Sequence, residues 1–112
     1  MFRRALVILP LLLWAPLANA GPTSLPDAAT GKQLAEKLCT NCHLIGSAAQ
    51  QQPANVDVPS FPEIASREGQ TEGAITARII LPKHPMPQIP LTKAEIADLA
   101  AYILSLRENA RP

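Results

Sequence analysis

Cys39 and Cys42 are the two cysteines of this 112-residue chain, and His43 directly follows the second. A disulfide between them would close a very small loop, so it would constrain the unfolded chain little and make a poor staple. In a chain that leaves a helix, two thiols at this spacing reach the two vinyl groups of a porphyrin, and the next residue falls beneath the iron. C-x-x-C-H is the signature of haem c attachment. It predicts one covalently bound haem c per chain, with His43 as an iron ligand.

Three other interpretations of this segment remain open. A zinc site needs three or four protein ligands, and residues 21–112 offer only two cysteines and two histidines, so carboxylates would have to take part. A thioredoxin-like dithiol also uses C-x-x-C, but it normally follows a strand, and no strand pattern precedes Cys39. A plain disulfide is the third alternative. We favour haem attachment, and no catalytic residue is predicted.

The N-terminal stretch has the pattern of a secretory signal peptide. It combines arginines at positions 3 and 4, an apolar run over residues 5–14, and the sequence Ala-Asn-Ala at residues 18–20. We expect cleavage after this last segment, so that residues 1–20 are the signal peptide and residues 21–112 form one domain in the periplasm. An uncleaved membrane anchor is the alternative, although the apolar run is short for a span of ~20 residues.

The part of the chain after residue 20 has little apolar material for a core. It holds 8 basic and 9 acidic residues, a net charge of −1 with histidine neutral. Nucleic-acid-binding proteins usually show a concentrated basic face, so no nucleic-acid partner is expected. The only aromatic residues there are Phe61 and Tyr102. Chains this small often rely on a cofactor, and a buried haem would supply the missing apolar volume.

Capping residues and helical periodicity predict an all-α domain. A first helix begins at Thr30, with a capping box completed three residues later, or one turn earlier at Asp27, and it leads into Cys39. Residues 44–59 show no clear periodicity and should form a loop. A short helix begins at Ser60, which is followed three residues later by a glutamate.

Two further helices are predicted in the C-terminal half of the chain. One runs over about residues 71–81 and ends before Pro82, which cannot continue a helix. The last helix starts with the capping box of Thr92 and Glu95, and its apolar residues recur at intervals of three and four. No strand pattern longer than a few residues is present, so we expect three to five helices and no sheet.

Met86 is the predicted second iron ligand. It is the only methionine after the signal peptide, and it lies in His84-Pro85-Met86-Pro87, within a proline-rich stretch over residues 82–90. A thioether is a soft, neutral ligand that suits haem iron, and His/Met ligation raises the reduction potential. A stiff loop also loses little entropy when it is held against the iron. His84 is the rival ligand, and a methionine that fills a hydrophobic gap is the plainer alternative.

A ligating histidine usually donates its other ring N–H to a carbonyl or a carboxylate, which fixes the ring orientation. Pro53 and Pro59 both lie downstream of His43 at plausible range. We prefer the carbonyl of Pro59, because Pro59-Ser60-Phe61 leads into a helix and should be well ordered.

Taken together, these residues resemble the small soluble class I cytochromes c of bacterial type. In that family a glycine and an aromatic residue on the first helix cross an apolar residue and an aromatic residue on the last helix. Gly31 matches the glycine, Leu99 and Tyr102 match the last helix, and Ala35 departs from the usual aromatic. The resemblance covers about residues 31–106.

The resemblance implies a cytochrome c-like fold of three to five helices around one haem, with Pro59-Ser60-Phe61 lining the proximal side. Iron that is ligated by both His43 and Met86 has no open position for a substrate, which suits electron transfer between a donor protein and an acceptor protein. We therefore expect a monomeric electron carrier that is not inserted in a membrane after signal cleavage. The alternatives are a haem subunit of a periplasmic dehydrogenase or oxidase, an enzyme such as a peroxidase, and a ligand-binding or sensing haem protein.

Overall fold

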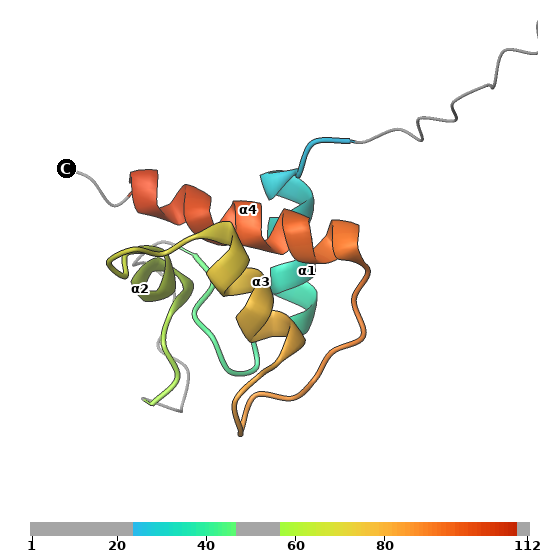
Figure 1. The fold of residues 1–112 in the computed structure, drawn as a ribbon. Coiled ribbons are helices and arrows are strands. Elements are labelled where there is room, and N and C mark those ends of the chain that lie inside the picture. The colour runs from blue at the N-terminus through green and yellow to red at the C-terminus, as the bar shows by residue number, and fades with distance from the viewer. Residues whose placement is uncertain (1–23, 47–56, 110–112) are drawn as a thin grey trace, which may run out of the picture.

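The computed structural model describes residues 24–46 and 57–109, which form four α-helices (Figure 1). These are α1 (Ala28–Leu38), α2 (Phe61–Ala65), α3 (Glu72–Ile80) and α4 (Lys93–Asn109). No strand occurs within these two ranges. The prediction of an all-α domain with three to five helices is therefore confirmed.

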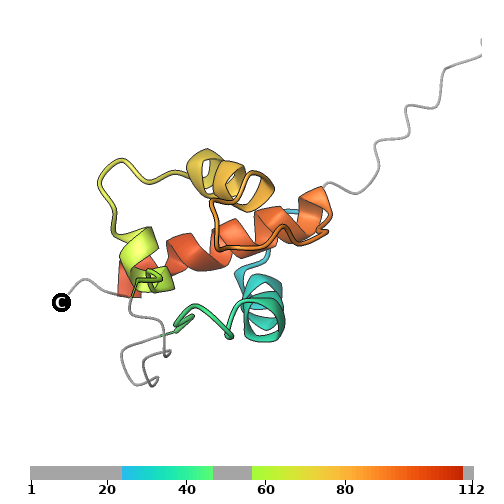
Figure 2. The same ribbon diagram turned by 90° about the horizontal axis from the view of Figure 1, so that it is seen from below.

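The domain is built around α4. The helices α1, α2 and α3 each contact α4, and none of these three contacts another of the three. Figure 2 shows α1 and α3 on opposite sides of α4, with α2 beside its C-terminal half. The buried residues that α4 contributes to the core are Leu99, Ala100, Tyr102, Ile103 and Leu106. One long helix thus fixes the positions of the other three.

The crossing of α1 and α4 occurs at Gly31. A Cβ atom on this residue would lie 1.9 Å from the backbone oxygen of Asp98, so only glycine permits this approach. One turn further along α1, the side chain of Ala35 is fully buried. The backbone N–H of Asp27 donates to Asp98 Oδ1 at 2.7 Å. These contacts set α1 on α4 and thereby fix the position of Cys39 at its C-terminal end.

The preferred start of the first helix was wrong. Asp27, the alternative, is the N-cap of α1, and its carboxylate accepts a hydrogen bond from the N–H of Ala29. Thr30 lies in the first helical turn, where its hydroxyl donates to Asp27 Oδ2 at 2.7 Å. Thr30 therefore supports the cap and does not form it.

The starts of the other helices agree with the predictions. Ser60 caps α2 in a complete capping box with Glu63. Thr71 caps α3, which ends at Ile80, two residues before Pro82. At the start of α4 the N–H of Thr92 donates to Glu95 Oε2 at 2.7 Å, and the N–H of Glu95 donates to Thr92 Oγ1 at 3.2 Å.

None of the helices in the described part of the chain is both long enough and apolar enough to cross a membrane. The predicted signal peptide, residues 1–20, lies outside the described residues, as do Pro53 and most of the predicted loop that contains it.

Candidate functional site

The segment from Cys39 to His43 continues α1 as a tight turn. The N–H of Cys39 donates to the oxygen of Ala35 at 2.9 Å, and the N–H of His43 donates to the oxygen of Cys39 at 2.9 Å. The thiol of Cys39 is half-buried and that of Cys42 is exposed, and no disulfide joins them. The turn therefore presents two free thiols and an imidazole at the C-terminal end of α1.

The ring of His43 is held by the backbone carbonyl of Pro59. Its Nδ1 atom lies 2.7 Å from the Pro59 oxygen. A carbonyl oxygen only accepts hydrogen bonds, so Nδ1 carries the proton in this contact and Nε2 of the neutral ring keeps its lone pair. The imidazole is thus oriented with one nitrogen available to a metal ion. Of the two prolines that the sequence offered, Pro59 is the one that lies within the described residues.

The Pro59 carbonyl stands at a well-ordered junction. The next residue, Ser60, is the N-cap of α2, and its N–H donates to Glu63 Oε2 at 2.6 Å. The N–H of Phe61 donates to the oxygen of Leu44 at 2.8 Å. The backbone after Pro59 is therefore tied both to its own helix and to the residue that follows the C-x-x-C-H segment.

Two aromatic rings connect His43 to the core of α4. The ring centroids of His43 and Phe61 lie 5.3 Å apart, and those of Phe61 and Tyr102 lie 6.3 Å apart. The Tyr102 hydroxyl donates to the backbone oxygen of Ile45, just after the C-x-x-C-H segment. Because Phe61 and Tyr102 are buried, these two rings form a packed support on one side of the imidazole.

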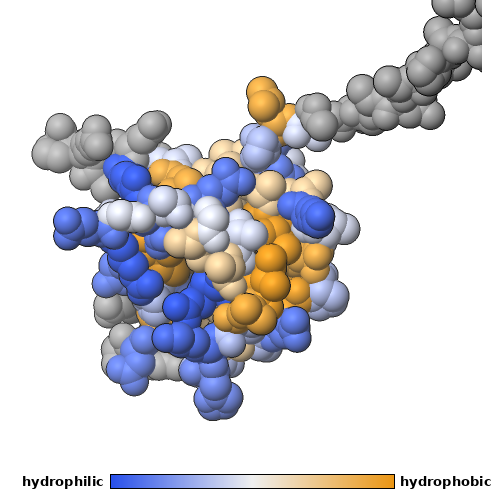
Figure 3. Space-filling view, viewed as in Figure 1, coloured by the Kyte–Doolittle hydropathy of each residue, from blue (hydrophilic) through white to orange (hydrophobic). Residues whose placement is uncertain are grey.

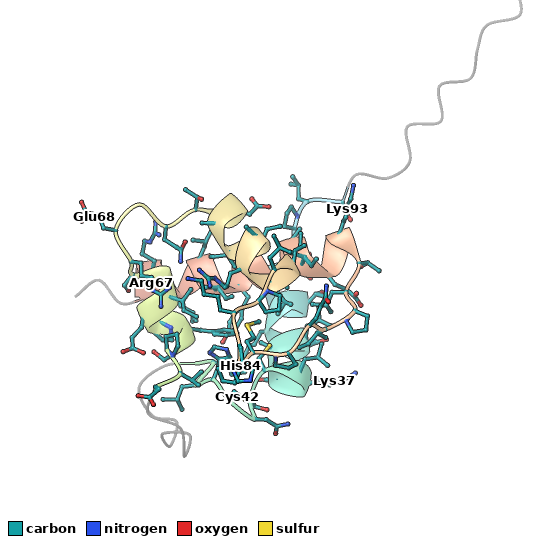
Figure 4. All side chains as sticks on the ribbon, turned by 60° about the horizontal axis from the view of Figure 1, so that its bottom comes forward. Lys37, Cys42, Arg67, Glu68, His84 and Lys93 are labelled. Carbon is teal, nitrogen blue, oxygen red and sulfur yellow. The ribbon has the colours of Figure 1, made fainter. Side chains whose placement is uncertain are left out.

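Met86 lies on the segment that follows α3, whereas His43 lies on the segment that follows α1. The side chain of Met86 is half-buried, and its N–H donates to the oxygen of Lys83 at 3.0 Å. His84 is exposed, and Figure 4 shows it at the same end of the molecule as Cys42.

An apolar hollow lies on another face of the molecule. Figure 3 shows apolar side chains gathered over α3 and the segment after it, where Ile80 is 47% exposed and Leu81 is 75% exposed. The hollow is lined by Ile79, Ile80, residues 88–91 and Ile96. None of the predicted site residues lines it.

The structure disfavours two of the alternatives for the cysteines. Burial, together with the nearby Cys42, raises the pKa of the Cys39 thiol, whereas a reactive dithiol centre requires a lowered pKa. Within residues 24–46 and 57–109, no group of three or more His, Cys, Asp or Glu side chains is placed to hold a metal ion. A zinc site in this part of the chain therefore has no ligand set.

The residues present do fit a haem c. The chain offers two free thiols, an imidazole with an available Nε2 beside them, and a thioether on the segment after α3. The helices α1, α2 and α3 contact α4 but not one another, and the hydrophobic core joins them through α4. A large apolar cofactor bonded at the end of α1 suits both the donor set and this packing.

Comparison with known proteins also points to a protein that binds haem c. The family model for cytochrome c matches residues 28–107, and the chain belongs to the cytochrome c family. One relative is cytochrome c-552 of Bradyrhizobium diazoefficiens, which is 34% identical over 96 residues that cover 86% of this chain and 90% of that protein. No solved structure matches the chain significantly.

Family membership makes this protein a small c-type cytochrome that carries electrons on a covalently bound haem c. It is an electron carrier and not an enzyme, and it works with redox partner proteins. Cys39 and Cys42 fit the attachment motif of the family.

Phe61, which the resemblance placed in the segment lining the proximal side, packs against the imidazole of His43. The hydrogen bond from Tyr102 to the backbone of Ile45 was not predicted from the sequence. The shortage of aromatic residues was a usable signal, because the two present after the signal peptide, Phe61 and Tyr102, both support this site. The sequence pattern predicts Glu63 only as part of a helix cap, whereas in the structure Glu63 is also bonded to the peptide unit that holds His43.

Proposed function

We propose that Cys39 and Cys42 hold the haem through thioether bonds, and that His43 Nε2 and Met86 Sδ are the two axial ligands of its iron. The haem supplies a centre that accepts and releases one electron. The observation that carries the proposal is the 2.7 Å contact between His43 Nδ1 and the Pro59 oxygen. It leaves the lone pair of Nε2 available beside the two thiols, which supports Nε2 as the ligating nitrogen and Pro59 as the residue that orients the proximal ligand.

Met86 is favoured as the distal ligand over His84 by its chemistry and its surroundings. It is the only methionine after residue 1, and prolines stand on both sides of it. Its side chain is half-buried, whereas His84 is exposed. A neutral thioether favours reduced iron and raises the potential, which suits a carrier. Protein ligands on both sides of the iron would leave no position for a substrate.

We also propose that residues 1–20 are a cleaved signal peptide and that residues 21–112 act in the periplasm as a monomer. The charged, apolar and small-residue regions of the first twenty residues support export. The absence of a membrane-spanning helix from residues 24–46 and 57–109 is compatible with a carrier that moves between partners. A precursor and a mature form that differ in mass by residues 1–20 would support this part of the proposal.

The absorption spectrum of the purified holoprotein tests the ligand set. We expect the oxidised protein to be low-spin with a weak charge-transfer band near the red end, which reports sulfur ligation. Met86→Ala should abolish this band, lower the reduction potential and allow small exogenous ligands to bind. The matched variant His84→Ala should leave the band and the potential unchanged.

Two results would contradict the proposal. A high-spin spectrum of the wild-type protein would mean an open iron position, and therefore a ligand-binding or sensing protein. A band that survives in Met86→Ala but disappears in His84→Ala would exchange the roles of these two residues. Stable co-purification with a dehydrogenase or an oxidase would instead indicate a subunit of a larger complex.

A further inference from the structure

We propose that Glu63 is a positioning residue for the iron ligand His43 and that it acts through the peptide unit between Pro59 and Ser60. This inference rests on the proposed axial role of His43. The carbonyl of Pro59 and the N–H of Ser60 belong to one planar unit. At one end of this unit the oxygen accepts from His43 Nδ1 at 2.7 Å, and at the other end the N–H donates to Glu63 Oε2 at 2.6 Å.

The geometry makes the carboxylate of Glu63 a determinant of where the Pro59 oxygen points. The bond between Pro59 and Ser60 is trans, so its C=O and N–H point in opposite directions and turn together. Ser60 Oγ also donates to Glu63 Oε2 at 2.8 Å, and the N–H of Glu63 donates to Ser60 Oγ at 3.3 Å. A carboxylate that fixes the direction of the N–H thus fixes the acceptor for His43.

The negative charge of Glu63 should also change the basicity of the His43 imidazole. Its hydrogen bonds with the backbone and then the hydroxyl of Ser60 hold its pKa below the ordinary range, so it is a carboxylate at neutral pH. Successive hydrogen bonds polarise one another, so an anion on the N–H makes the carbonyl oxygen of the same unit a stronger acceptor. A stronger acceptor on Nδ1–H makes Nε2 of His43 a more basic ligand. A more basic ligand favours oxidised iron, so Glu63 lowers the reduction potential.

The chain offers a matched control for this effect. Glu95 occupies the same position in the other complete capping box, where its Oε2 accepts from the N–H of Thr92 at 2.7 Å. The peptide unit of that N–H carries the carbonyl of Leu91 and not that of Pro59. Glu63→Gln and Glu95→Gln each remove one negative charge and keep an oxygen acceptor, so they differ in which peptide unit loses its anion.

Two measurements on the purified holoprotein test the inference. One is the equilibrium of electron exchange with a mediator of fixed potential, and the other is the NMR resonance of the His43 Nδ1 proton in the reduced protein. We expect Glu63→Gln to shift the equilibrium towards reduced protein by about two- to fivefold and to move the proton resonance upfield, because the hydrogen bond weakens. Glu63→Ala should shift both further, and Glu95→Gln should change neither.

Wild-type values of both quantities in Glu63→Gln would overturn the inference. An equal shift in Glu95→Gln would overturn it as well, since the effect would then be one of general charge. If Glu63→Ala does not fold, Glu63→Gln decides the question alone. The far-red band of the oxidised wild-type protein reports separately on Met86, so a protein without that band contradicts the proposed ligand pair while the Nδ1 resonance still tests Glu63.

Discussion

The backbone oxygen of Asp98 lies 1.9 Å from the point that a Cβ atom on Gly31 would occupy. The same Asp98 accepts a hydrogen bond from the backbone N–H of Asp27 through its side chain. One residue of α4 therefore contacts α1 at two points, once through its backbone and once through its carboxylate. Because Cys39 follows α1 directly, this contact also sets the position of the haem-attachment segment relative to α4.

Gly31→Ala should destabilise the holoprotein strongly. Overpacking a core usually lowers the free energy of unfolding by about 1–3 kcal/mol. Here the neighbouring atom belongs to the backbone and cannot rotate away, so we expect the free energy of unfolding to fall by about 3 kcal/mol or more. Gly73→Ala is the matched control, because a Cβ atom there would meet only Thr71 Oγ1 at 3.9 Å. Since alanine favours a helix more than glycine does, the free energy of unfolding of that variant should rise by about 0.5–1 kcal/mol. Urea unfolding measures the stability of both variants. A Gly31→Ala protein with the same unfolding midpoint as the wild type would contradict a close, rigid contact between α1 and α4.

Tyr102→Phe should lower the free energy of unfolding by about 1–2 kcal/mol, because it removes the hydroxyl that donates to the backbone of Ile45. The ring contact with Phe61 would remain. Tyr102→Leu should cost more, since it also removes the aromatic ring next to Phe61. Burial, followed by the charge of Glu36, raises the pKa of Tyr102, so the hydroxyl should remain a donor at alkaline pH. Equal stability of Tyr102→Phe and wild type would show that this hydrogen bond contributes no net stability.

The helix starts show which parts of the fold are determined locally. Ser60 caps its helix as predicted, because its capping box is formed by Ser60 and Glu63 alone. Thr30 was preferred as the cap of α1 on similar grounds, yet the N-cap of that helix is Asp27. The N–H of Asp27 is bonded to Asp98, which lies 71 residues further along the chain. A local pattern carries no information about such a contact.

The candidate site also combines features that the sequence predicts with features that only the tertiary structure shows. The segment from Cys39 to His43 was recognisable because its chemistry follows from residue types and their spacing. The acceptor for the His43 ring was a choice between two prolines, since spacing alone does not show which carbonyl turns towards the ring. The sequence places the capping box directly after Pro59. The helix-cap pattern alone does not predict that the peptide unit bonded to Glu63 is also bonded to His43. The capping box of Ser60 and Glu63 is visible in the sequence, whereas the contact between the Pro59 carbonyl and His43 joins residues that are distant in the sequence.

Acid should destabilise the protein in part through Asp27. Hydrogen bonds from the side chain of Thr30 and then the backbone of Ala29 lower the pKa of Asp27 in the folded protein. Its contribution to stability is therefore present above the unfolded pKa of about 4, and it is lost as the pH falls through the lower folded value. Asp27→Asn keeps a capping side chain but does not titrate, so urea unfolding between about pH 5 and pH 2 should show a shallower decline. An unchanged slope in Asp27→Asn would contradict this role.

Arg107 connects the end of α4 to the chain between α2 and α3. Its Nε donates to the oxygen of Ala65 at 2.7 Å, and its Nη2 donates to the oxygen of Gln70 at 3.0 Å. A lysine ammonium does not reproduce this planar pair of donors, so Arg107→Lys should lower the free energy of unfolding by about 1–3 kcal/mol. The loss should be accompanied by faster amide hydrogen exchange in α2, because Ala65 belongs to that helix. Arg78→Lys is the control, since Arg78 is exposed and its side chain makes no hydrogen bond or ion pair within the described residues. Wild-type stability and exchange in Arg107→Lys would show that α2 is held on α4 by its apolar contacts alone.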